Sequence, residues 1–288
     1  MYPDYLFSSN HITLDGHRMH YLDEGSGPVV VMVHGNPTWS FYYRHLVQAL
    51  KATHRVIVPD HIGCGLSDKP QDYNYTLSQH IKNLNCLLDH LGIEKFSLMV
   101  HDWGGAIGMG VAVGRVADID KIVVLNTAAF RSTRIPLRIR VCKLPVIGEI
   151  LVRLFNGFAW PATFMAVNKK MLPAVAKAYI SPYDNWANRI AIHRFVADIP
   201  LAPDHPSYKT LTEIELGLKS LEQAQTEMMI VWGGRDFCFN DYFYQEWKQR
   251  FPSAQHHYFQ DGGHYVLEDK KDEVEPLVLS FFTQRVSP

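Results

Sequence analysis

Short apolar runs alternate along this chain with longer stretches in which apolar residues recur every three or four positions. Six runs predict strands, at residues 28–33, 55–60, 96–100, 122–126, 228–232 and 255–259, the last more polar than the others. Residues 76–91 carry the helical spacing, with Leu77, Ile81, Leu84, Leu87, Leu88 and Leu91 apolar. Continuous apolar strands that alternate with helices predict an α/β fold, a mostly parallel sheet covered by helices on both faces.

One region departs from this alternation. Between residues 130 and 212 the chain has only helical stretches and no strand-like run, and this is too long for a loop. We therefore predict an inserted helical cap over residues 130–212, with residues 1–129 and 213–288 forming the main domain. Because the insertion follows the carboxyl end of a strand, where parallel sheets collect their chemistry, the cap is expected to lie over the active site as a lid.

Composition and charge exclude several classes of function. The 288 residues are 47% hydrophobic with a net charge of −1, so a large core is expected and no global attraction to nucleic acid. The four cysteines are scattered and the 15 histidines show no metal-ligand spacing, which argues against a disulfide framework or a metal site. The N-terminus lacks the pattern of a secretory signal. A cytoplasmic protein without a metal is predicted.

Candidate chemistry begins at the end of the third predicted strand. The segment Val100-His101-Asp102-Trp103-Gly104 has the form of a nucleophile elbow, the sharp strand–turn–helix usually written G-x-S-x-G, with aspartate in place of serine. The alternative is that Asp102 only caps the following helix, since aspartate is a favoured N-cap residue. This segment by itself does not separate the two interpretations.

Two residues further along favour catalysis. Asp236 in W-G-G-R-D and His264 in D-G-G-H-Y each follow a predicted strand. The order nucleophile, acid, base is the chain order of the α/β-hydrolases. We therefore predict Asp102 as nucleophile, His264 as base and Asp236 as the acid that orients the imidazole, with Asp241 as a fallback. Asn126, after the fourth strand, cannot act as the acid because an amide carries no negative charge.

A carboxylate nucleophile predicts a particular kind of chemistry. It suits attack at a tetrahedral carbon, which displaces a leaving group and leaves an alkyl-enzyme ester. Water deprotonated by His264 would hydrolyse that ester, with Asp236 stabilising the charged imidazole. Backbone N–H groups of Asn36 and Trp103 are predicted to hold the oxyanion.

Four segments resemble the haloalkane dehalogenase family of α/β-hydrolases over nearly the whole chain: V-H-G-N-P-T-W-S, P-D-H-I-G-C-G-L-S-D-K-P, V-H-D-W-G-G-A-I-G and D-G-G-H-Y-V-L-E-D. Two more, N-P-T-W-S-F-Y-Y-R and A-F-R-S-T-R-I-P-L-R-I, resemble its third subfamily, which includes the β-lactone decarboxylases of long-chain olefin biosynthesis. The resemblance implies no cofactor. It also implies that the Trp103 indole and the Asn36 side-chain amide together bind the leaving halide or oxygen.

Four functions remain open at this point. The resemblance favours decarboxylation of a cis-β-lactone with long alkyl chains to a cis-olefin, and next the hydrolysis of haloalkanes. An epoxide hydrolase would need two lid tyrosines, for which Tyr179, Tyr183 and Tyr208 are candidates. The fourth is a non-catalytic receptor or scaffold, which the intact set of candidate residues disfavours.

The predicted cap carries two further features. Its apolar residues are candidates for a substrate pocket, although they could equally pack the cap onto the main domain: Phe155, Phe158, Trp160, Phe164, Met165 and Tyr208. Residues 131–153 form a basic amphipathic segment. Such a segment is usually a solvated face. Otherwise it docks on an acidic partner, a multi-enzyme assembly or a membrane surface, which would place the protein at the periphery of the inner membrane.

Overall fold

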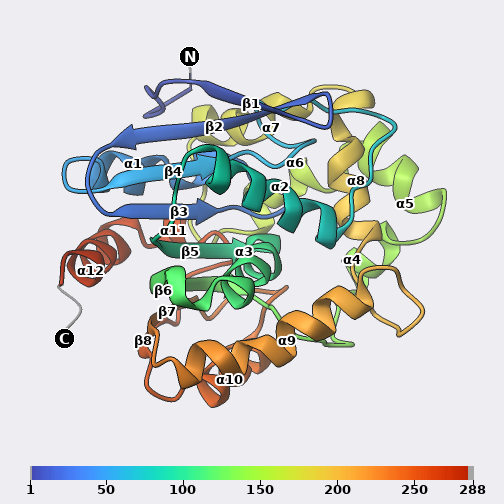
Figure 1. Ribbon diagram of the computed structural model, residues 1–288. Helices are drawn as coiled ribbons and strands as arrows, with labels where there is room; N and C mark the ends of the chain where they lie inside the picture. The colour runs from blue at the N-terminus through green and yellow to red at the C-terminus, as the bar shows by residue number, and fades with distance from the viewer. Residues whose placement is uncertain (1, 285–288) are drawn as a thin grey trace.

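The computed structural model describes residues 2–284, and eight strands in this range form one sheet in the order β1-β2-β4-β3-β5-β6-β7-β8 (Figure 1). Strands β3 to β8 pair in parallel, whereas β2 pairs antiparallel with β1 and with β4. The strands are β1 Asn10–Leu14, β2 His17–Gly25, β3 Val29–Val33, β4 Arg55–Pro59, β5 Phe96–Asp102, β6 Ile119–Thr127, β7 Glu227–Gly233 and β8 Gln255–Phe259.

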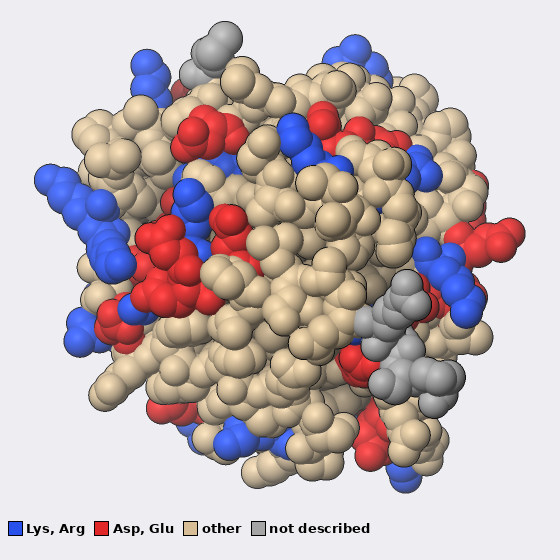
Figure 2. Space-filling model, turned by 90° about the vertical axis from the view of Figure 1, so that its left-hand side faces the viewer, with Lys and Arg blue, Asp and Glu red and all other residues tan. Residues whose placement is uncertain are grey.

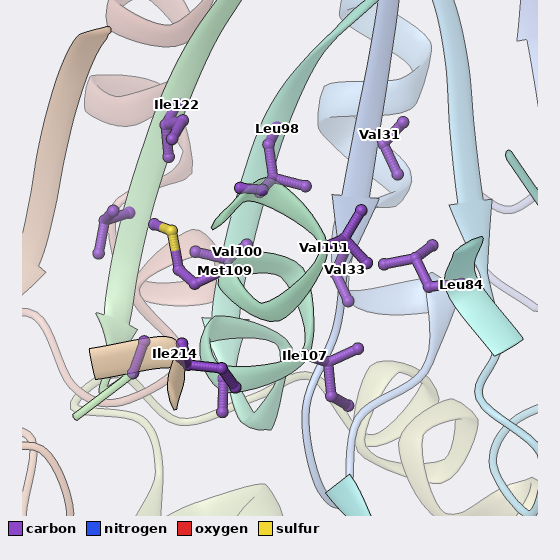
Figure 3. Packing of buried hydrophobic residues seen from close by; sticks show 14 of the residues in the cluster. Val31, Val33, Leu84, Leu98, Val100, Ile107, Met109, Val111, Ile122 and Ile214 are labelled. Carbon is purple, nitrogen blue, oxygen red and sulfur yellow. The ribbon is translucent and has the colours of Figure 1, made fainter. Parts of the chain in front are cut away.

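Each central strand buries side chains on both faces of the sheet. On one face Val31, Leu98 and Val100 belong to one apolar cluster with Ile107 and Met109 of helix α3 (Figure 3). The alternate residues of the same strands, such as Met32 and Met99, belong to a second apolar cluster on the opposite face. This explains why the strands are continuously apolar in sequence, because neither face of a parallel sheet of this kind meets water.

The helices of the main sheet divide between its two faces. Those with residues in the first cluster are α2 Leu77–His90, α3 Trp103–Gly114, α9 Tyr208–Gln223 and α10 Asp241–Arg250. Those with residues in the second are α1 Arg44–Leu50, α11 Val266–Asp269 and α12 Lys271–Thr283, together with the 3₁₀ turn η1 Ser40–Tyr43. A further 3₁₀ turn, η2 Val116–Asp118, precedes β6.

A series of short helices lies between β6 and β7, at the top and right of Figure 1. They are α4 Leu137–Cys142, α5 Ile147–Glu149, the π-helical turn η3 Ile150–Leu154, α6 Ala159–Met165, α7 Pro173–Ile180, η4 Ser181–Tyr183, η5 Ala187–Arg189 and α8 Ile190–Ala197. Helix α9 follows and runs through residue 212, where we placed a domain boundary. Within residues 2–284 no helix combines the length and the apolar character needed to cross a bilayer.

The sequence pattern missed the two antiparallel strands at the edge of the sheet. Strands β1 and β2 contain many polar residues. Most residues of β1 are partly or fully exposed, so they need not be apolar. Their turn did carry a signal: Asp15 and Gly16 have φ values of 48° and 83°. An Asp-Gly pair is typical of a tight hairpin turn that needs positive φ at both positions.

Candidate active site

Asp102 lies at the turn between β5 and α3, with φ and ψ of 52° and −128°. Residues other than glycine rarely adopt this backbone conformation, because it is strained. Such strained residues are concentrated at functional sites. Asp102 stands at the N-cap position of α3, but its side chain makes no capping hydrogen bond. Its Oδ1 accepts instead from the backbone N–H of Asn36, at 2.6 Å. Helix capping therefore does not account for this carboxylate.

Glycines allow the turn to pack this tightly. A Cβ on Gly35 would lie 2.1 Å from Oδ1 of Asp102, and a Cβ on Gly104 would lie 2.0 Å from the carbonyl oxygen of Val33. Both distances are far below any real contact of a Cβ atom. The Asp102 side chain and the Val33 backbone would have to move to relieve the clash, which would disrupt the turn. The two positions therefore require glycine so that the carboxylate can face the strand end.

The structure brings Asp102, His264 and Asp236 together although they are far apart in sequence. Nε2 of His264 lies 3.5 Å from Oδ2 of Asp102, and its Nδ1 lies 2.7 Å from Oδ2 of Asp236. The other oxygen of Asp236 accepts from the backbone N–H groups of Cys238 and Phe239, at 2.7 and 3.0 Å. All three side chains are buried. The fallback Asp241 instead accepts from the Tyr258 hydroxyl, at 2.7 Å.

The two carboxylates keep the imidazole between them charged. Burial lowers the pKa of His264, but the charge of Asp236, with the bonds to Asp102 and Asp236, outweighs it and raises the pKa to about 10. Burial raises the pKa of Asp102, and the bond and charge of His264 more than offset this, so the pKa lies below its usual value. At neutral pH the site thus holds one imidazolium between two carboxylates.

We expect the stability of the fold to depend on this imidazolium. Because the pKa of His264 is raised on folding, its contribution to the free energy of unfolding is complete below the unfolded value of about 6.5. That contribution is lost as the pH rises through about 10. Urea unfolding at neutral and alkaline pH measures the loss. The variant His264→Gln should show a smaller fall over the same range, and an equal fall in both proteins would contradict the assignment.

His101, one residue before the turn, supports His264 from behind. Its Nε2–H donates to the backbone oxygen of His264 at 2.9 Å, and the two rings are 4.5 Å apart. Its other face stacks on Tyr42, with ring centroids 4.4 Å apart. Burial lowers the pKa of His101 to about 3, so it remains neutral beside the imidazolium.

The two acids of the final motif, Glu268 and Asp269, link the histidine loop to the inserted helices, which the sequence did not reveal. Asp269 accepts from the N–H groups of Gly263, Asn168 and Lys169 at 2.7 to 2.8 Å. Glu268 forms a paired salt bridge with Arg44 and accepts from the hydroxyl of Tyr179: Nη1–Oε1 2.6 Å, Nη2–Oε2 3.0 Å and Oη–Oε1 2.5 Å.

Replacement of Asp269 should loosen the histidine loop and the inserted helices together. Asp269→Ala removes the acceptor of the buried N–H of Gly263 and of the part-buried N–H groups of Asn168 and Lys169, and we expect a loss of about 2 kcal/mol in the free energy of unfolding. Turnover should also fall, because Gly263 precedes His264. Urea denaturation and steady-state rates measure both effects. The exposed neighbour Asp272 provides the control, and Asp272→Ala should leave both quantities near wild type.

Asn36 and Trp103 flank the Asp102 carboxylate at the base of a cavity. The side-chain Nδ2 of Asn36 donates one hydrogen to the backbone oxygen of Ile192, at 3.1 Å. An amide nitrogen has two hydrogens, so one remains for a ligand. The indole of Trp103 packs against Phe195, with ring centroids 5.3 Å apart. Within residues 2–284, the Trp103 indole N–H and the second amide hydrogen of Asn36 have no hydrogen-bond acceptor.

The cavity has a volume of about 360 Å³, and its surface is largely apolar. Among the residues that we predicted for the pocket, Phe158 and Met165 line it. Ten further residues line the cavity although we did not predict them for the pocket. They are Arg134, Ile135, Arg138, Ile139, Ala162, Val196, Leu211, Phe237, Phe239 and Phe243. An apolar cavity with a few polar groups at its base suits a hydrophobic small molecule.

Phe155, Trp160, Phe164 and Tyr208 do not line this cavity. The first three are more than half exposed, and Tyr208 lies under the guanidinium of Arg131. Helical spacing explains the difference. Residues 161, 162 and 165 share the inner face of α6, together with the flanking residues 158 and 166, whereas 160 and 164 lie on the outer face.

The remaining candidates lie away from the cavity. Tyr183 is buried, and its hydroxyl donates to the backbone oxygen of Thr38 at 3.3 Å, whereas Tyr179 bonds to Glu268. Asn126 joins β6 to β7: its Nδ2 donates to the oxygen of Gly233 at 3.0 Å and its Oδ1 accepts from the same residue's N–H at 2.8 Å. This amide is structural.

Comparisons with known proteins place the chain among the α/β-hydrolases. Residues 28–271 match the family model described as the alpha/beta hydrolase fold. A cis-3-alkyl-4-alkyloxetan-2-one decarboxylase of Shewanella oneidensis is 46% identical over 96% of this chain and 89% of its own length. Another of the same name, from Xanthomonas campestris, is 42% identical over 97% of each chain. A solved haloalkane dehalogenase from Agrobacterium tumefaciens superimposes with a TM-score of 0.85 at 23% identity, covering 96% of each chain.

Proposed function

The chain belongs to the α/β-hydrolase family and, within it, to the group of cis-3-alkyl-4-alkyloxetan-2-one decarboxylases, and we propose that it converts cis-dialkyl β-lactones to cis-alkenes and carbon dioxide. The observation that carries this proposal is the buried carboxylate of Asp102 at the base of an apolar cavity. Its side chain does not cap helix α3. Two alkyl chains suit such a lining.

In the first step Asp102 attacks ring carbon 4, the carbon that bears the ring oxygen. A bond forms between the carboxylate and this carbon, and the bond from the carbon to the ring oxygen breaks. The electron pair stays on that oxygen, so the former lactone carbonyl becomes a carboxylate on ring carbon 3. Attack at the carbonyl would instead leave an alkoxide on ring carbon 4, which is a poor leaving group for alkene formation.

In the second step the new ester leaves. The bond between ring carbon 3 and the carboxylate breaks, its electron pair forms the double bond, and the Asp102 carboxylate departs unchanged with loss of carbon dioxide. Attack from behind the ring oxygen places the ester opposite the carboxylate, so elimination without rotation yields the cis-alkene. The sequence of steps consumes neither water nor a proton.

The surrounding groups have defined tasks in these steps. The Trp103 indole and the free amide hydrogen of Asn36 donate to the carboxylate that the first step releases. The imidazolium of His264, 3.5 Å from Asp102, stabilises the carboxylate that the second step releases. Asp236 keeps the imidazole charged and oriented.

A second candidate, haloalkane hydrolysis, is favoured by the same donor pair, which suits a halide as well as a carboxylate. Here the ester must be hydrolysed, and His264 must be neutral to deprotonate water. Alkylation of Asp102 removes one of the two charges that raise the pKa of His264. The pKa then falls, and the base becomes available only after the first step.

An epoxide hydrolase receives less support. Its ring opening needs acidic hydroxyls beside the nucleophile, and the three candidate tyrosines do not line the cavity among the described residues. Tyr179 and Tyr183 are committed to bonds elsewhere.

A paired assay of the purified protein tests the proposal. One reaction offers a long-chain cis-dialkyl β-lactone and measures cis-alkene by gas chromatography, and the other offers n-butyl bromide and measures bromide. We expect stoichiometric alkene and much slower bromide release. Fast bromide release without alkene would support the second candidate, and the absence of both products would contradict the assigned chemistry.

A further inference from the structure

The outer surface of the inserted helices is unusually apolar. Nine of the sixteen exposed large apolar side chains among the described residues lie between residues 137 and 164, each 40% to 74% exposed. We call this surface the cap face, and it consists of Leu137, Leu144, Val146, Ile147, Ile150, Leu154, Phe155, Trp160 and Phe164. Exposed apolar patches of this kind mark interaction sites.

The charged residues of the cap-face segment are mostly basic. Residues 131–164 contain six basic residues and a single acid, Glu149, which is bonded to Arg153 at 2.5 Å. Arg134, Arg138 and Arg140 are exposed and form no salt bridge within residues 2–284. On the face of the molecule seen in Figure 2, by contrast, basic and acidic groups lie side by side. A surface that combines bare arginines with apolar side chains complements anionic lipid.

The cap face adjoins the opening of the cavity. Helices α4 and α6 touch where the guanidinium of Arg138 lies 3.8 Å from the sulfur of Met165, and both of these side chains line the cavity. The same helices expose Leu137, Trp160 and Phe164 outward. Arg134 and Arg138 are at once cavity-lining and exposed, so they stand at its rim.

We propose that the cap face binds the surface of an anionic lipid bilayer, with its apolar side chains inserted and the rim arginines at the lipid phosphates, so that the cavity opens onto the membrane. This surface is separate from the chemistry at Asp102, and the proposal would hold for any hydrophobic substrate. It explains how a water-insoluble dialkyl substrate reaches a buried carboxylate without crossing water.

Vesicle binding by the full chain tests the proposal. Vesicles of equal parts phosphatidylglycerol and phosphatidylcholine should co-sediment the protein, and pure phosphatidylcholine should bind at least about tenfold less. Binding should weaken as salt rises from about 0.05 to about 0.3 M, since screening shortens the reach of the arginines. Brominated lipids should quench Trp160, and Trp160→Phe should remove that quenching.

Matched variants separate this surface from the rest of the molecule. We expect the double substitution Trp160→Ser with Phe164→Ser, and separately Arg140→Glu, to weaken binding by about tenfold or more. The controls Leu216→Ser and Lys219→Glu, on exposed positions of α9, should bind like wild type. The inactive Asp102→Asn should also bind like wild type, which distinguishes a failure of this proposal from a failure of the proposed chemistry.

Three results would overturn the proposal. The first two are no binding to anionic vesicles at low salt, and binding that the cap-face variants leave unchanged. The third is a protein that self-associates and does not bind vesicles, and that becomes monomeric when Trp160→Ser is combined with Phe164→Ser. The last result would assign the cap face to contacts between copies of this chain. Analytical ultracentrifugation of the same proteins distinguishes it.

Discussion

Asp102→Asn should reduce alkene formation by roughly 10⁴-fold or more, because no other side chain of the site can form the ester. The amide keeps the size of the carboxylate and can still accept from the N–H of Asn36, which is 2.6 Å from Oδ1 in the wild type. Loss of activity would therefore not arise from collapse of the turn. Gas chromatography of the alkene measures the rate, and circular dichroism confirms the fold.

This substitution has an internal control in the pKa of His264. Without the Asp102 charge, one of the groups that raise this pKa to about 10 is gone. Titration followed by NMR of the imidazole should show a lower pKa in Asp102→Asn than in the wild type. Turnover that survives in Asp102→Asn would remove the nucleophile from the mechanism, whatever the titration shows.

His264→Gln should separate the two candidate reactions. With a β-lactone, loss of the imidazolium should slow alkene formation by about 10²- to 10³-fold, because the departing Asp102 carboxylate loses its charged partner. Turnover should nevertheless continue beyond one cycle, since the second step needs no water. With n-butyl bromide the variant should release at most one bromide per enzyme and then stop, because the ester can no longer be hydrolysed.

Mass spectrometry of the intact protein checks this difference. We expect a butyl adduct to accumulate on His264→Gln after exposure to the bromide, and no comparable adduct from the lactone. Asp236→Asn is the matched control, because it keeps the imidazole but removes the carboxylate 2.7 Å from Nδ1. Alkene formation that stops after one cycle in His264→Gln would show that water takes part, and the two-step elimination would be wrong.

The amino-acid sequence determined the central sheet and the order of the candidate catalytic residues. All six predicted strands occur in the structure, because strands buried on both faces must be continuously apolar. The sequence also predicted the elbow at Asp102, because Asp102 stands between an apolar strand and Gly104, which is typical of a sharp strand–turn–helix. The chain order then indicated Asp236 and His264 before any distance was known.

Tertiary structure alone decided what each side chain contacts. Glu268 and Asp269 became visible as links to the inserted helices only when partners more than eighty residues away came within hydrogen-bond distance. Strands β1 and β2 escaped detection because an edge strand can remain polar, and its pairing is settled by its neighbour rather than by its own pattern.

The inserted helices show the same division most clearly. Their helical character followed from local spacing, but the faces of α6 were assigned by what they pack against: Phe158 and Met165 line the cavity, while Trp160 and Phe164 face outward. The sequence determined that these residues are apolar and helical. Only the packing of α4 and α6 over the strand ends decided which of them enclose the cavity, because burial is a property of the assembled fold and not of a segment.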